Sequence, residues 1–192
     1  TSTCTFNVTV ADTASPAITC PTAPASVEAT SSAGVPVSYE PATATDTGDD
    51  SVAITYSAAS GSTFAIGTTT VTATATDDSG NTATCSFNVT VVDTASPAIT
   101  CGAHNNTNID TSGNGTNDAT EATSASGAAV TWSASSATDT GYAAGNITIS
   151  YANASGTAVV SGDIFAIGTH TITATATDGS SNTHTCTFTV KV

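Results

Sequence analysis

The sequence predicts an all-β protein made of tandem antiparallel β-sandwiches, and three observations support this fold class. Val, Ile and Thr recur at every second position in strings such as TATATD and TCSFNVTV, which is the periodicity of a strand with one buried face. Met is absent, and Thr, Ser and Ala are the dominant residues. The same strings occur twice in the same order, so the fold is expected to occur twice.

The repeat boundaries follow from the spacing of these strings. DTASPAITC begins at Asp12 and again at Asp93. Residues 12–92 therefore form repeat 1, and residues 93–192 form repeat 2. Residues 1–11 contain TCTFNVTV, a near copy of the string that ends repeat 1. We interpret this segment as the last strand of an upstream repeat.

Repeat 2 contains 20 more residues than repeat 1, because FAIGT and TATATD recur 101 residues later whereas DTASPAITC recurs 81 residues later. Twelve of the extra residues fall before the second ATDT string, within residues 102–127. This stretch is rich in Gly, Asn, Thr and Ser, a composition that predicts a surface loop. The other extra residues lie between the second ATDT string and Phe165.

Each repeat is expected to form short strands. The last two strands of repeat 1 alternate Val, Ala and Phe on one face with Thr and Asn on the other, and DDSG joins them into a hairpin. An Asp-rich segment, Pro41–Ser51, predicts a loop, and Gly61–Gly67 predicts a tight corner. Seven or so short strands in 80–100 residues indicate an antiparallel sandwich. The strands that we expect are Pro16–Cys20, Val35–Glu40, Val52–Ala58, Thr69–Asp77 and Asn81–Val92.

Five widely spaced cysteines indicate disulfides formed in an oxidising compartment. Cys20 and Cys85 occupy the same repeat positions as Cys101 and Cys186, so we expect one bridge within each repeat. Cys4 is left over and would pair with a cysteine in an upstream repeat or a neighbouring subunit.

The charge balance excludes several classes of protein. The chain has 15 acidic residues and a single base, Lys191, for a formal net charge of −14. Nucleic-acid binders and proteins that dock on anionic lipid need Lys and Arg, so neither partner is expected. No apolar run is long enough for a membrane-spanning helix, and direct membrane insertion is not expected either.

The order of motifs resembles the hyalin repeat (HYR) domain. D-x-x-x-P-x-I-x-C is followed by V-x-Y or V-x-W, then S-G-x-x-F-x-x-G-x-x-x-V, then A-x-D-x-x-x-N-x-x-x-C-x-F-x-V. All four motifs occur in this order in both repeats, with Ile172 in place of the last Val of the third motif in repeat 2. The resemblance covers nearly the whole chain. It implies tandem immunoglobulin-like sandwiches in an extracellular or cell-surface protein, as in the large surface adhesins of Bacteroidota. Repeat 2 departs from the family pattern where Gly102, rather than proline, follows Cys101.

Acidic residues are expected to gather at one end of each sandwich, because the N-terminus and two loops share that end in immunoglobulin-like folds. Several carboxylates arriving from different loops would suit Ca²⁺, which could stiffen the joint between repeats. The alternative is that these residues form turns and supply solubilising charge. The candidate ligands are Asp12, Asp46, Asp49, Asp50, Asp77 and Asp78 in repeat 1, and Asp93, Asp139 and Asp178 in repeat 2.

Other candidate sites have weaker signals. Asn7 and Asn88 lie in N-x-S/T sequons, and Thr13 and Thr94 lie in Asp-Thr-Ala strings similar to a motif that some Bacteroidota O-glycosylate. Tyr142 has no counterpart in repeat 1 and is a candidate ligand contact.

The histidines do not indicate an enzyme. His104 lies in the inserted loop, whereas His170 and His184 replace Thr69 and Ala83 of repeat 1 and are expected to be exposed strand residues. Three aromatic pairs recur at equivalent positions and are expected in the two cores: Tyr39 and Trp132, Phe64 and Phe165, and Phe87 and Phe188.

The leading functional hypothesis is a structural and adhesive segment of a long extracellular repeat protein or surface filament, whose partners are adjacent repeats or neighbouring subunits. One alternative is a glycan- or protein-binding module that uses residues 102–127. A second is a filament subunit that donates residues 1–10 to its neighbour. A third, the weakest, is an ice- or crystal-binding face built from outward Thr rows.

Overall fold

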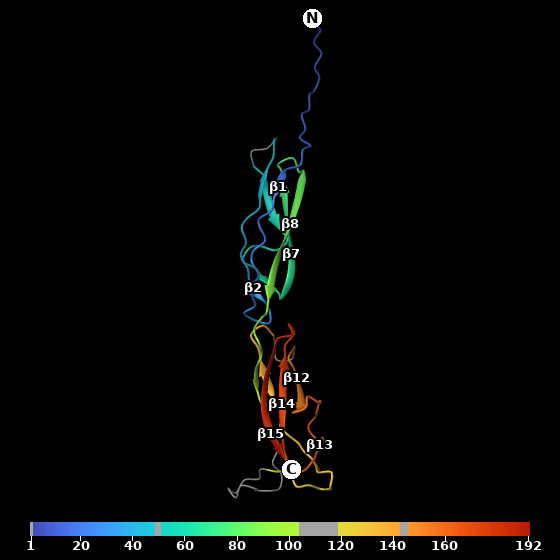
Figure 1. The fold of residues 1–192 in the computed structure, drawn as a ribbon. Helices are drawn as coiled ribbons and strands as arrows, with labels where there is room; N and C mark the ends of the chain where they lie inside the picture. Colours follow the sequence, from blue (N-terminus) through green and yellow to red (C-terminus); the bar gives the residue numbers. More distant parts are fainter. Residues whose placement is uncertain (1, 49–50, 104–118, 143–145) are drawn as a thin grey trace. The chain divides into compact units, whose positions relative to one another are not determined.

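The protein is described by a computed structural model (Figure 1) that covers residues 2–48, 51–103, 119–142 and 146–192. The chain forms two compact units. Unit 1 consists of Thr1–Ala29 and Ala33–Val92, and unit 2 consists of Thr30–Ser32 and Asp93–Val192. The unit boundary at Asp93 coincides with the repeat boundary that the sequence indicates.

Unit 1 has one four-stranded sheet with the order β2-β8-β7-β5 and two short strand pairs, β1-β4 and β3-β6. All pairs are antiparallel except β2 with β8, which is parallel. The strands are β1 (Ala17–Thr19), β2 (Val27–Glu28), β3 (Val35–Pro36), β4 (Thr43–Thr45), β5 (Ala53–Tyr56), β6 (Thr63–Phe64), β7 (Gly67–Thr76) and β8 (Thr82–Val92).

The long β7–β8 hairpin supplies one wall of the core of unit 1 (Figure 1). Val71 pairs with Phe87, and both side chains are buried, as alternation predicts. Tyr39, from the segment after β3, packs edge-on against Phe87 with a centroid distance of 4.8 Å. On the outward face, hydroxyl and amide groups pair with one another across the hairpin, as Thr72 does with Ser86 at 3.1 Å.

Unit 2 repeats this architecture. Its sheets have the orders β12-β14-β15, β11-β9 and β10-β13, and every pair is antiparallel. Lys191 lies in β15, opposite Thr169 of β14. The strands are β9 (Ala98–Thr100), β10 (Ala128–Ala129), β11 (Ser136–Thr138), β12 (Thr148–Asn153), β13 (Ile164–Phe165), β14 (Thr169–Thr177) and β15 (Thr183–Lys191).

The core of unit 2 is built around Trp132, which occupies the position of Tyr39. Its ring contacts Phe165 and Phe188 at centroid distances of 6.2 and 5.8 Å. Ile172 and Val190 are fully buried beside it. The three recurring aromatic pairs therefore lie in or against the two cores, as predicted.

Three short strands of unit 1 were not predicted. β4 lies inside Pro41–Ser51, which the sequence indicated as a loop, and it pairs with β1. β6 lies inside the expected corner Gly61–Gly67 and pairs with β3. β2 pairs with the end of β8. Conversely, the expected strand Val35–Glu40 keeps only its first two residues as β3. Strands of two or three residues are too short to show a periodicity of two.

One disulfide lies within each unit. Cys20, which directly follows β1, is bonded to Cys85 in β8. Cys101, which directly follows β9, is bonded to Cys186 in β15. These are the two pairs that equivalent repeat positions predict. Each bridge joins the first strand pair of its unit to the main sheet.

The segment Ser2–Val10 forms no strand and is exposed along its length. Phe6, Val8 and Val10 are 82%, 76% and 93% exposed, and Cys4 is a free, exposed thiol. The assignment of residues 1–11 to an upstream repeat therefore stays a prediction. Among the described residues, no helix is long and apolar enough to cross a bilayer.

Candidate functional site

Three carboxylates converge at one end of each unit. In unit 1 they belong to Asp12 before β1, Asp46 after β4 and Asp77 after β7; one oxygen of each lies within 4.8 Å of the others. In unit 2 the same arrangement is formed by Asp93, Asp139 and Asp178. All six residues are among the candidate ligands expected from the sequence, because the N-terminus and two loops of an immunoglobulin-like sandwich share one end.

Backbone amides hold the carboxylates of unit 1 in place. The Ala14 amide donates to Asp12 Oδ1 at 2.9 Å, and the Gly48 amide donates to Asp46 Oδ1 at 2.7 Å. Each of these two hydrogen bonds closes a local turn. Each uses Oδ1 of the carboxylate and leaves Oδ2 for another partner. Asp12 Oδ2 is buried and has no hydrogen-bond partner, and a buried acceptor without a partner is costly.

The third carboxylate is fixed by an asparagine. The Asn81 side-chain amide donates to Asp77 Oδ2 at 2.8 Å and to the Asp12 carbonyl oxygen at 3.3 Å. In unit 2, Asn182 makes the equivalent bonds to Asp178 Oδ2 and the Asp93 carbonyl oxygen, at 2.9 and 3.1 Å. The asparagine thus ties the incoming chain to the turn of the last hairpin in both units.

The pKa of Asp77 reflects this hydrogen bonding. Burial alone would raise the pKa of its carboxyl group. Bonds from the side chain and backbone of Asn81, and from the amides of Gly80 and Ser79, outweigh burial and hold the pKa below its ordinary value. The carboxylate therefore keeps its negative charge at neutral pH.

Two kinds of residue at this site were not identified from the sequence. One is the asparagine pair, Asn81 and Asn182. The other is the glycine pair, Gly48 and Gly141: a Cβ at Gly48 would lie 2.7 Å from Asp12 Oδ2, and one at Gly141 would lie 2.5 Å from Asp93 Cγ. The sequence contains two strings that could have identified them: D-x-x-x-N for the asparagines and D-T-G for the glycines. Both strings recur in both repeats.

The donor set fits a hard divalent cation. Ca²⁺ binds oxygen ligands at about 2.3–2.6 Å, so two ligands of one ion lie at most about 5 Å apart. The spacing of up to 4.8 Å between the carboxylate oxygens is within this limit. Three close negative charges repel one another, and a bound cation would remove that repulsion.

Three further residues were named as candidate ligands, Asp49, Asp50 and Asp78. Asp49 and Asp50 lie outside the described residues. Asp78 is exposed and is not one of the three convergent carboxylates. Of the expected surface loop 102–127, residues 104–118, which include His104, also lie outside the described part of the chain.

Tyr142 lies beside the carboxylates of unit 2. Its backbone amide donates to Asp139 Oδ1 at 3.2 Å, and its hydroxyl group lies 3.2 Å from the Ser180 hydroxyl. The ring packs so closely on Gly179 that a Cβ there would lie 2.5 Å from a ring carbon. Tyr142 therefore connects the Asp139 loop to the Asp178 turn, and its role as a ligand contact stays a prediction.

The four candidate glycosylation residues, Asn7, Asn88, Thr13 and Thr94, are all exposed. Asn88 lies on the outward face of β8, where its Oδ1 accepts a hydrogen bond from the Thr70 hydroxyl at 3.0 Å. Modification at these residues stays a prediction that intact-mass and peptide mass spectrometry of the native protein would check.

The two strand histidines differ from one another. His184 is exposed, as predicted. His170 was also expected to be exposed, but it is half-buried and its ring lies 5.2 Å from that of Phe165. The equivalent residue of unit 1, Thr69, is also half-buried, so partial burial belongs to this strand position in both units.

Comparison with solved structures finds other all-β proteins with modest overall agreement. One match is to the fibronectin(III)-like modules of CbhA from Clostridium thermocellum, with 14% identity, a TM-score of 0.35, and coverage of 92% of this chain and 93% of that chain. Another is to extracellular cadherin domains 1–4 of protocadherin gamma B7, with 16% identity, a TM-score of 0.41 and coverage of 93% of this chain. The present chain spans 49% of that protocadherin chain.

Comparison with protein families is more informative. The model of the HYR domain matches residues 11–91 and again residues 92–192, so two contiguous matches account for almost the whole sequence. Each match contains one disulfide and one group of three convergent carboxylates. The chain thus consists of two consecutive immunoglobulin-like β-sandwiches, and it belongs to the HYR domain family.

Proposed function

We propose that this chain is a load-bearing segment of a long extracellular adhesive protein, where consecutive HYR domains supply reach and mechanical continuity. HYR domains are extracellular, and adhesion-type repeat proteins are built from such modules. Two disulfides are consistent with an oxidising compartment. The observation that carries the proposal is the position of the bridge in each unit.

Each bridge lies close to where tension would enter and leave its unit. A load on unit 1 would act through Asp12 at one end and Val92 at the other. The Cys20–Cys85 bond gives that load a covalent route past 65 residues of chain. Only residues 12–20 and 85–92 could then lengthen. In unit 2 the equivalent bond bypasses 85 residues.

Stretching single molecules from both ends tests this proposal. With the bridges intact, we expect each unit to release only its short terminal segments. In reducing buffer, unfolding should release about 230 Å more chain from unit 1 and about 300 Å more from unit 2, at roughly 3.5 Å per residue. Equal extension in oxidising and reducing buffer would contradict the proposed load path.

We further propose that each group of three carboxylates binds Ca²⁺. Support comes from the convergence of three carboxylate oxygens within 4.8 Å of one another, from the buried and unpaired Asp12 Oδ2, and from the recurrence of the arrangement in both units. Bound Ca²⁺ would supply positive charge, and the carboxylates would hold the chain entering each unit against two loops. Three carboxylates completed by water suit the affinity of extracellular modules, with Kd of about 10⁻⁴–10⁻³ M.

Removal of calcium should lower the melting temperature of both units. With this Kd, 10 mM Ca²⁺ is about 10–100 times the Kd and stabilises the folded state by about 1.4–2.7 kcal/mol, which should give a clear shift in differential scanning calorimetry. Asp46→Asn should abolish the shift in unit 1 only, and Asp139→Asn in unit 2 only. Glu40→Gln, which alters an exposed acid outside both groups, is the matched control. A melting profile that does not change with EDTA would leave these carboxylates as turn residues.

A further inference from the structure

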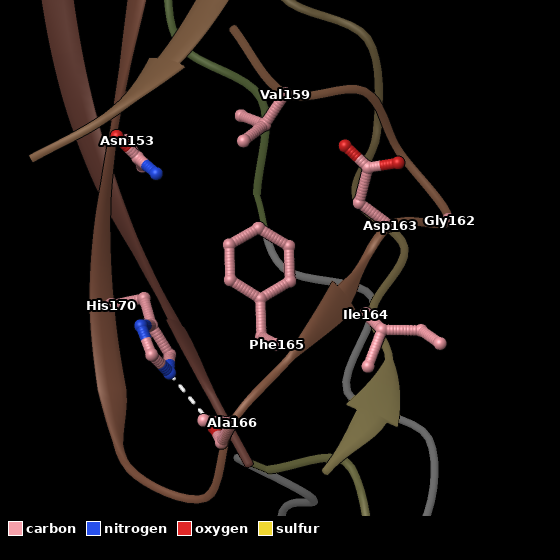
Figure 2. Close-up of a pocket in the computed structure, with 8 residues that line it drawn as sticks. All are labelled: Asn153, Val159, Gly162, Asp163, Ile164, Phe165, Ala166 and His170. Atoms are coloured by element: carbon pink, nitrogen blue, oxygen red, sulfur yellow. Dashed lines mark hydrogen bonds between the residues drawn. The ribbon is translucent and has the colours of Figure 1, made fainter. Parts of the chain in front are cut away.

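Unit 2 contains a pocket that is separate from the carboxylate groups (Figure 2). Its volume is about 640 Å³, and its walls include Asn153, Val159, Asp163, Phe165 and His170. A second hollow of about 330 Å³ shares Asn153 and His170 with the first. Ligand sites in proteins commonly have volumes of about 300–1,000 Å³.

The pocket results from an insertion that repeat 1 lacks. Tyr56 pairs with Ala73 and Tyr151 pairs with Ala174, so the two tyrosines are equivalent. Phe64 is eight residues after Tyr56, whereas Phe165 is fourteen residues after Tyr151. The six additional residues form a tight turn. In this turn the backbone amide of Asn153 donates a hydrogen bond to the backbone carbonyl oxygen of Thr157 at 2.9 Å.

The turn fixes the orientation of the Asn153 side chain. Its Oδ1 accepts hydrogen bonds from the backbone amides of Ser155 and Thr157, at 3.1 and 2.9 Å. The Nδ2 group is therefore directed the other way, and Figure 2 shows it pointing into the pocket. Asn153 presents a hydrogen-bond donor in a fixed position.

Asp163 and His170 are anchored in the same manner. The Val160 amide donates to Asp163 Oδ2 at 2.8 Å, and this bond leaves Oδ1 as an acceptor. His170 Nε2 lies 2.8 Å from the Ala166 carbonyl oxygen. Because a carbonyl oxygen can only accept, Nε2 carries the proton and Nδ1 of the neutral ring is an acceptor. In each of the three polar side chains, one atom is thus fixed by a hydrogen bond within the protein, and a second atom can form a hydrogen bond with a ligand.

Apolar groups complete the pocket. Figure 2 shows the Phe165 ring between Asn153 and His170 on one side and Asp163 on the other. Val159 lines the same space. Ile164 also lines the pocket and is 69% exposed.

We propose that this pocket of unit 2 binds an uncharged saccharide. A sugar hydroxyl both donates and accepts, so neighbouring hydroxyls could satisfy the donor of Asn153 and the acceptors of Asp163 and His170 together. The C–H face of a sugar ring would contact Val159 and Phe165. An anionic sugar is disfavoured because Asp163 lines the pocket and the chain carries a net charge of −14.

Repeat 1 provides an internal control for this proposal. The positions equivalent to Asp163 and His170 are Ser62 and Thr69, and Ala58 is equivalent to Asn153 in the strand register. None of the three polar groups of the pocket is present there. The two domains share a fold, so the difference in side chains would confine binding to unit 2.

The test is a titration of the isotope-labelled full chain with cellohexaose, mannohexaose and xylohexaose, followed by amide chemical shifts. We expect saturable shifts for residues 153–170 with at least one of these sugars, and a Kd below about 1 mM. The anionic hexamer of galacturonic acid and a Lys-Leu-Lys peptide should give no saturable shift. Absence of a response to all three neutral sugars, or a stronger response to either charged probe, would overturn the proposal.

Variants that import the residues of repeat 1 separate binding from folding. Asp163→Ser and His170→Thr should each weaken binding at least tenfold, while the remaining amide signals and Trp132 fluorescence show that unit 2 is folded. Ser62→Ala and Thr69→Ala are matched controls in unit 1 and should leave binding unchanged. Undiminished binding by the folded Asp163→Ser/His170→Thr double variant would exclude this pocket.

Discussion

Replacing both Cys20 and Cys85 by alanine is expected to lower the free energy of unfolding of unit 1 by about 4 kcal/mol. The bridge closes a loop with a sequence separation of 65 residues, and it restricts the unfolded chain by an entropy that grows with loop length. Domains of this size are stable by only about 5–15 kcal/mol. The change would therefore remove a large part of the stability of unit 1.

Urea denaturation measures this effect in each unit separately. Trp132 is the only tryptophan of the chain and lies in unit 2, so its fluorescence follows that unit alone, whereas far-ultraviolet circular dichroism follows both. Cys4→Ser should be present in every protein compared, because the Cys4 thiol is exposed and could exchange with the bridges. An unchanged dichroism transition, or an equal shift of the Trp132 transition, would show that the bridge does not stabilise unit 1 specifically.

Truncation of the core of unit 2 is expected to have an effect of similar size. Ile172 is fully buried in β14 among Val130, Trp132 and Phe165. Ile172→Ala should lower the free energy of unfolding by about 2–5 kcal/mol, because the side chains around it can fill the cavity only in part. The Trp132 transition in urea reports the change directly.

The conservative control is Ile172→Val, because repeat 1 has Val71 at the equivalent position. Loss of one methylene should cost only about 0.5–1.5 kcal/mol. Equal losses for the alanine and valine variants would mean that the cost does not follow the volume removed. A loss below about 1 kcal/mol for Ile172→Ala would mean that the core around Trp132 repacks.

The sequence predicted the parts of the fold that carry a long or repeated signal. β7 and β8 were predicted because their alternation extends over 10 and 11 residues. The cysteine pairs were predicted because two copies of the same positions could be compared. β2, β4 and β6 were missed because two or three residues fit almost any local structure, and only pairing with a distant strand makes them strands.

The same distinction applies to the sites. Asp12, Asp46 and Asp77 could be grouped because the N-terminus and two loops share one end of an immunoglobulin-like sandwich. The roles of Asn81 and Gly48 depend on contacts with Asp12, which no local pattern reveals. The pocket was missed for a different reason. Its extra residues were counted in the sequence, but the closed turn that Asn153 forms emerges only from the fold.

The position of Lys191 has a consequence for proteolysis. It is the only Lys or Arg in the chain, it is half-buried, and it lies opposite Thr169 in the β14–β15 hairpin. A protease that cleaves after basic residues therefore finds a single scissile bond in this sequence, and that bond lies at the end of β15. Residues 1–190 contain no Lys or Arg, so such a protease would not cleave within them even when both units are unfolded. Transient unfolding in a medium rich in trypsin-like enzymes would then be reversible, whereas most proteins would be degraded.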